Sequence, residues 1–110
     1  MEFGELEPAL QSFVLLHPEY SVPDGADGMC FFASVEFQEV LDELGLLSEG
    51  LRETSDGWDV IKVRQIGSPP IEVPRYTIHW AFRWKSLAID WTARQFWEEA
   101  RWPEIWKLGS

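Results

Sequence analysis

The chain has 110 residues, 45% of them hydrophobic and 15% aromatic, which suffices for a compact core and excludes global disorder. The net charge is −10 and is concentrated in residues 1–56, where thirteen acidic residues face a single basic one, Arg52. This half would repel a nucleic-acid duplex or an anionic membrane surface and would attract a basic protein partner, although a solvated acidic surface is the simpler explanation.

Several further features favour a soluble protein in a reducing, cytoplasmic setting. It lacks a run of about eighteen apolar residues, so no membrane span is expected. Its acidic start has no basic region followed by an apolar stretch, and its single cysteine cannot form an internal disulfide. Without repeats or a linker, residues 1–110 are expected to form one domain.

The first half of the chain predicts two helices. Over residues 7–16, apolar residues recur at helical spacing, and His17 before Pro18 ends the pattern. Residues 21–28 are rich in Pro, Gly and Asp and predict a loop. Over residues 28–44 an apolar stripe begins at Cys30, with Asp27 or Gly28 as the N-cap and Gly45 as the stop.

The second half predicts strands. Residues 58–63 read as a strand, and residues 67–74 as a proline-rich connection with edge-strand character. Residues 77–84 and 87–91 form a hairpin around Lys85-Ser86. A helix over 93–102 follows, with Thr92 and Gln95 as a capping box. Helices followed by strands predict an α+β fold in which the helices pack on a small antiparallel sheet.

Cys30 is the candidate nucleophile because it lies in the first turn of a predicted helix. Unpaired backbone N–H groups and the helix dipole favour the thiolate there, and the same N–H groups can bind an oxyanion. The alternative is a buried cysteine that packs as a small hydrophobe, and it is a strong alternative if Cys30 is considered alone.

The hairpin register supplies partners for this thiol. A two-residue loop places Ile89 opposite Phe82, and Asp90 then lies on the same face as His79, on the diagonal. A carboxylate there can fix the tautomer of the imidazole and stabilise the imidazolium. A slip of one residue would move Asp90 to the opposite face.

The order of Cys, His and Asp resembles that of papain-like and transglutaminase-like cysteine enzymes. Residues 79–96, which contain Asp-x-Thr-Ala-Arg-Gln-Phe over 90–96, are similar to those of small proteins of actinobacteria and their phages. This resemblance implies a Cys-bearing helix packed on a sheet that carries His and Asp, with Cys30 as nucleophile, His79 as base and acid, and Asp90 as orienting group. Papain-like enzymes often carry a Gln shortly before the Cys. Here the upstream Gln is the distant Gln11, so no side chain is assigned to the oxyanion.

Two functions follow as hypotheses. The first is a cysteine hydrolase or acyl transferase that acts on an amide, either a peptide bond or a glutamine side chain, in a protein or peptide substrate and without a cofactor. The second is a non-catalytic, acidic and Trp-rich protein-binding domain, such as a phage protein acting on a host factor, with a degenerate triad. A zinc site at Cys30, His79 and Asp90 is disfavoured, because the spacing matches no common ligand pattern and a fourth ligand is missing. For Arg94 and Gln95 a structural role at the strand–helix corner is favoured over a place in the cleft.

Overall fold

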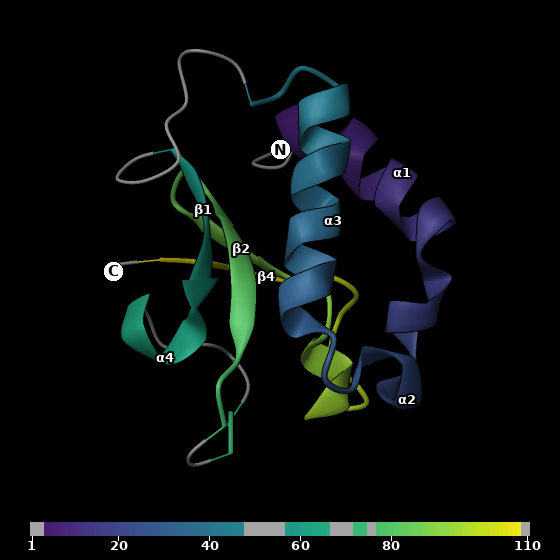
Figure 1. The fold of residues 1–110 in the computed structure, drawn as a ribbon, viewed down its shortest axis with the longest axis vertical. Helices are drawn as coiled ribbons and strands as arrows, with labels where there is room; N and C mark the ends of the chain where they lie inside the picture. Colours follow the sequence, from purple (N-terminus) through teal and green to yellow (C-terminus); the bar gives the residue numbers. More distant parts are fainter. Residues whose placement is uncertain (1–3, 48–56, 67–71, 75–76, 109–110) are drawn as a thin grey trace.

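The structure is a computed structural model that describes residues 4–47, 57–66, 72–74 and 77–108. It has an α+β architecture with a four-stranded antiparallel sheet in the order β1-β2-β3-β4. The strands are β1 (Trp58–Lys62), β2 (Trp80–Trp84), β3 (Leu87–Asp90) and β4 (Glu104–Lys107). Helices α1 (Glu7–Leu16) and α3 (Cys30–Glu43) lie on one side of the sheet, and α4 (Val63–Ile66) lies beyond β1 on the other (Figure 1).

The two long helices match the sequence prediction closely. Helix α1 has the predicted bounds and ends at His17. Helix α3 ends before Gly45, whose φ of 73° is easily adopted by glycine. The predicted loop over 21–28 is partly helical, because the 3-10 turn η2 (Pro18–Ser21) and the short helix α2 (Pro23–Ala26) lie between α1 and α3. Each begins at a proline, whose fixed φ suits the first helical position.

The predicted hairpin has the expected register. Trp84 pairs with Leu87 and Phe82 with Ile89 around Lys85 and Ser86. Strand β2 begins at Trp80, so the predicted strand over 77–84 is too long by its first three residues, and His79 precedes the strand. The predicted strand over 58–63 is one residue too long, because Val63 begins α4.

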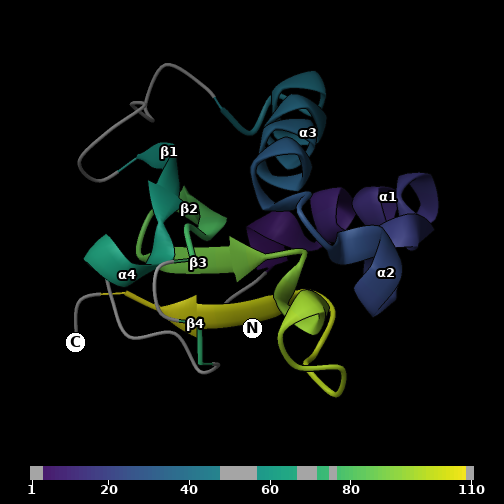
Figure 2. The ribbon, with the colours of Figure 1, turned by 60° about the horizontal axis from the view of Figure 1, so that its bottom comes forward.

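The segment after β3 is the largest departure from the prediction. The expected helix over 93–102 is only a 3-10 turn, η3 (Ala93–Gln95), without a side-chain cap at Thr92. The Thr92 N–H and hydroxyl bind Asp90 instead, so the capping box does not form. The chain then returns as β4 alongside β3, a strand that the sequence did not predict (Figure 2). Its four residues are too few for the alternating pattern to be recognised.

The core lies between the two long helices and the sheet. Phe13 of α1 and Phe37 of α3 meet Phe82 and Trp91 in a chain of ring contacts. On the opposite face, Ala81 packs with Val63 and Val73, against Phe96 and Trp106. Most of the proline-rich connection lies outside the described residues, and the described part, residues 72–74, has no regular structure. No described helix is long and apolar enough to cross a bilayer.

Candidate active site

Asp90 is the last residue of β3, and its buried carboxylate is fully engaged. Oδ2 accepts a hydrogen bond from His79 Nε2 at 2.6 Å. Oδ1 accepts from the Thr92 N–H at 3.0 Å and from the Thr92 hydroxyl at 3.4 Å. Because a buried charge is costly without partners, these bonds explain why an ionised side chain is tolerated at 1% exposure. They also fix the carboxylate as an orienting group for the imidazole.

His79 lies one residue before β2, on the face of the sheet that carries Asp90, and is 2% exposed. The Val63 N–H donates to its carbonyl at 3.0 Å, which holds this residue beside the start of α4. The ring of Phe96 packs edge-on against the imidazole, with the centroids 4.9 Å apart. Its second ring nitrogen, Nδ1, is buried and has no hydrogen-bond partner among the described residues. Asp90 thus fixes the imidazole at Nε2, and Nδ1 makes no hydrogen bond of ordinary geometry to a described residue.

The surroundings of His79 favour the imidazolium at neutral pH. Burial alone would lower the pKa of the imidazole, but hydrogen bonding with Asp90 and with Cys30 outweighs it and raises the pKa to about 9. The charged ring thereby forms a buried ion pair with Asp90.

Cys30 is the first residue of α3 and is 9% exposed. The N-cap of this helix is Met29, which makes no side-chain hydrogen bond to the first turn. The prediction of Asp27 or Gly28 as the N-cap was therefore wrong. No capping side chain therefore occupies the N–H groups of the first turn. Gly28 has a φ of 74°, which lets the chain turn into the helix two residues before the thiol.

The environment of Cys30 favours the thiolate. Burial would raise the pKa of the thiol, but hydrogen bonds from His79 and from the backbone N–H groups of Trp80 and Phe31, with the charge on His79, lower it below its usual value. Because Nδ1 makes no hydrogen bond of ordinary geometry, the contact with the thiol is loose. Between the lowered thiol pKa and about 9, the pair is thiolate and imidazolium.

Gln95 is a fourth residue at this site, and the sequence prediction gave it no chemical role. Its Oε1 accepts a hydrogen bond from the Gly28 N–H at 3.3 Å, so the carboxamide lies against the turn that precedes Cys30. Its Nε2 is buried and has no partner among the described residues. The position of Gln95 inside the Asp-x-Thr-Ala-Arg-Gln-Phe segment was the signal that could have identified it.

Arg94 has the structural role that the sequence favoured. Its guanidinium donates to the carbonyl of Ser21 at 2.7 Å and to that of Ala100 at 2.8 Å. These bonds tie η3 to the chain before α2 and hold Gln95 beside the start of α3.

The other histidine, His17, belongs to a separate acidic cluster on the helices. Its ring lies 3.0 Å from Glu19 and 3.5 Å from Glu36. Within the described ranges, no group of three or more Cys, His, Asp or Glu side chains has a geometry that would hold a metal ion.

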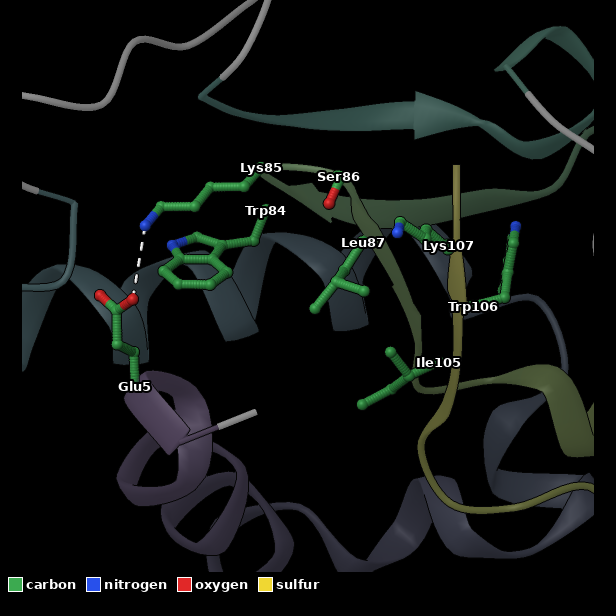
Figure 3. Close-up of a pocket in the computed structure, with 8 residues that line it drawn as sticks. All are labelled: Glu5, Trp84, Lys85, Ser86, Leu87, Ile105, Trp106 and Lys107. Carbon is green, nitrogen blue, oxygen red and sulfur yellow. Dashed lines mark hydrogen bonds and ion pairs between the residues drawn. The ribbon is translucent and has the colours of Figure 1, made fainter. Parts of the chain in front are cut away.

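A cavity of about 460 Å³ lies at the hairpin end of the sheet, away from the proposed triad (Figure 3). Trp84, Leu87 and Ile105 line its apolar part, and Lys85 bridges its rim to Glu5 at 3.4 Å. Because neither Cys30, His79 nor Asp90 lines it, this cavity is not part of the candidate active site.

Comparisons of the chain with protein-family models, with curated proteins and with solved structures found no match. The resemblance to papain-like and transglutaminase-like enzymes therefore stays a prediction.

Proposed function

We propose that this protein is a cysteine hydrolase or acyl transferase that acts on an amide, either a peptide bond or a glutamine side chain, through Cys30, His79 and Asp90. The observation that carries the proposal is a buried imidazole that Asp90 holds at Nε2 and whose contact with the Cys30 thiol, at a helix start, lowers the pKa of that thiol. The arrangement of a Cys-bearing helix on an antiparallel sheet with His and Asp also supports a papain- or transglutaminase-like core.

The first chemical step is acylation of the thiol. The Cys30 thiolate attacks the carbonyl carbon, a C–S bond forms, and the π electron pair moves to the carbonyl oxygen. The oxyanion collapses and breaks the C–N bond, while imidazolium Nδ1–H of His79 donates its proton to the leaving nitrogen. The products of this step are an amine, or ammonia from a glutamine side chain, and a thioester on Cys30.

The second step releases the acyl group. Neutral His79 removes a proton from water or from an amine nucleophile, which attacks the thioester carbon and expels the thiolate. Asp90 stays ionised throughout and stabilises the imidazolium that forms in each step. Water yields a carboxylic acid, and an amine yields a new amide.

The experiment is acylation of the native protein by a panel of acyl electrophiles, read by intact mass. We expect one acyl group per chain on Cys30, removed by hydroxylamine and absent from Cys30→Ala. The denatured chain is the matched control for intrinsic thiol reactivity. If native Cys30 reacts no faster than the same thiol in the denatured chain, the proposal is wrong.

A second candidate is a protein-binding domain without catalysis. Phe31 and Phe32 are exposed next to Cys30, at 45% and 61%, and are suited to contact a partner. With the acidic first half of the chain, they would fit a protein with a basic and apolar surface. An unreactive Cys30 in the acylation experiment would favour this candidate.

A further inference from the structure

We propose that the side chain of Gln95 supplies a hydrogen-bond donor for the oxyanion formed when Cys30 attacks a carbonyl. The inference rests on the proposed function and adds a catalytic residue to the three that the sequence identified. Gln95 Nε2 is a buried amide donor that has no hydrogen-bond partner among the described residues.

The orientation of the Gln95 carboxamide is fixed by its other end. The Gly28 N–H can only donate, so it must face Oε1, and the 3.3 Å contact leaves the NH₂ group as the free end. An unsatisfied buried donor costs about 1–3 kcal/mol, and such groups in folded proteins call for an explanation. A donor kept unpaired and desolvated is suited to a charge that develops only during reaction.

The neighbours of Gln95 place it at the reacting residues. Gly28, which binds its Oε1, stands two residues before Cys30. Phe96, the next residue along the chain, packs its ring against His79. Contacts between α2 and η3 hold this segment against the turn that leads into α3. Gln95 therefore contacts the turn that precedes Cys30, and Phe96 contacts the imidazole of His79.

Buried unpaired nitrogens also occur elsewhere among the described residues, on the indoles of Trp84, Trp91 and Trp106. A tryptophan side chain has one N–H donor and no acceptor, so no second hydrogen bond of the indole can fix the direction of that N–H. Gln95 differs because one end of its carboxamide is anchored and the other is free.

The proposed donor would act together with the backbone. The first N–H groups of a helix have no intrahelical partner, and the Phe31 N–H contributes to the lowered pKa of the Cys30 thiol. When the carbonyl is attacked, a backbone N–H of this turn and the Gln95 NH₂ would share the negative charge on oxygen. This assignment fills the role for which no side chain was found before Cys30 in the sequence.

The test compares two electrophiles that differ in their need for an oxyanion. Iodoacetamide alkylates a thiolate by displacing iodide and forms no oxyanion, whereas p-nitrophenyl acetate reacts through a tetrahedral intermediate and releases p-nitrophenolate. Both rates are measured for Cys30 in the full chain at a pH where the thiolate is fully formed, so that a change in the thiol pKa between variants does not affect either rate. The readout is the ratio of the acylation rate to the alkylation rate.

Two variants separate the donor from the anchor. Gln95→Glu keeps an acceptor for Gly28 N–H and loses the donor, and Gln95→Met loses both at similar size. We expect both to lower the ratio about 10²- to 10³-fold, the usual effect of removing one oxyanion donor. If Gln95→Glu restores the wild-type ratio while Gln95→Met does not, Gln95 acts only by holding Gly28 and the inference is overturned.

An unchanged ratio in both variants also overturns the inference but leaves the proposed function intact. A wild-type Cys30 that reacts with neither electrophile faster than the denatured chain overturns the proposed function itself. Thermal unfolding of each variant confirms that the rates belong to folded protein. Should Gln95→Met not fold, Gln95→Glu alone decides whether the donor is needed.

Discussion

The two faces of the sheet bury different kinds of side chain. The face that packs against α1 and α3 is filled by aromatic and aliphatic groups, among them Phe82, Ile89 and Trp91. The opposite face buries the ion pair of His79 and Asp90 beside a small cluster around Ala81. The first face stabilises the fold through apolar burial, whereas the second buries a charged pair whose desolvation offsets much of its electrostatic attraction. This difference is consistent with the proposed role of His79 and Asp90 in the reaction.

The largest expected effect is at the thiol. Cys30→Ala should abolish acylation and turnover, because no other described side chain at the site is a comparable nucleophile. Its folding should change little, since the residue is small and lies at the end of the helix. Mass spectrometry and urea unfolding measure the two effects separately. Acylation that persists in this variant would place the reactive group elsewhere.

A substitution of Asp90 should damage the chemistry more than the shape. Asp90→Asn keeps the volume but removes the charge that raises the pKa of His79. We expect turnover to fall by about 10²-fold or more, and the thiol pKa to move up toward its usual value of about 8.5. The measurement is the pH dependence of Cys30 alkylation. An unchanged profile would mean that Asp90 does not act through His79.

The apolar face provides the matched contrast. Phe82→Ala should cost about 3–5 kcal/mol of unfolding free energy, because it leaves a cavity against Phe37 and Trp58. In the fraction that remains folded, the alkylation pKa of Cys30 should be unchanged. A shift in that pKa comparable to the one in Asp90→Asn would show that the two faces are not independent.

The buried imidazole should also make stability depend on pH. The pKa of His79 is about 9 in the folded chain and about 6.5 when unfolded, so its contribution is complete below about pH 6.5 and is lost as pH rises through 9. The lowered pKa of Cys30 acts in the opposite direction, because its contribution is present at high pH and is lost as pH falls through the folded value.

Cys30→Ala isolates the contribution of His79, since Asp90 still raises the pKa of its imidazole. Its unfolding free energy should fall as pH rises from about 6.5 toward 9, over a narrower range than in the native chain, by about 1.4 kcal/mol for each unit by which Asp90 alone raises the pKa of the imidazole. Urea unfolding across this range measures the slope. The double variant Cys30→Ala, His79→Gln should not show this dependence of the unfolding free energy on pH. If the single and double variants have the same slope, a group other than His79 causes it.

The smallest expected effect is at the turn before the helix. Gly28→Ala introduces a side chain at a φ of 74° and should cost about 1 kcal/mol. Nothing lies within 4 Å of the added Cβ, so strain in the backbone is the only source of the loss. Chemical unfolding measures it, and a neutral result would mean that the turn relaxes without cost.

The parts of the fold that the sequence predicted are those with a long pattern. Helix α3 shows three turns of apolar spacing, and the register of the hairpin follows from the burial of Phe82 opposite Ile89. The same register placed Asp90 beside His79, so the geometry of this pair could be predicted although its catalytic role remains a prediction. Helix α4 and strand β4, with four residues each, are too short for a period to be recognised.

Long-range contacts account for what the sequence did not predict. The hydrogen bond between Gly28 and Gln95 joins residues 67 positions apart, and no local pattern encodes it. The same is true of the bond from Arg94 to Ser21, which holds η3 in place of a longer helix. Thr92 was predicted as a helix cap, but the buried carboxylate of Asp90 competes for its N–H and hydroxyl. Ile78, which lies within the predicted strand over 77–84, is 63% exposed because it precedes the observed strand β2.

The most direct test of the account is the pH dependence of Cys30 alkylation by iodoacetamide, in the native protein and in His79→Ala. We expect an apparent thiol pKa well below the usual value of about 8.5 in the native protein, and a return toward that value in the variant. A native pKa at or above 8.5, or the same lowered pKa in both proteins, would contradict a thiolate that is stabilised by His79.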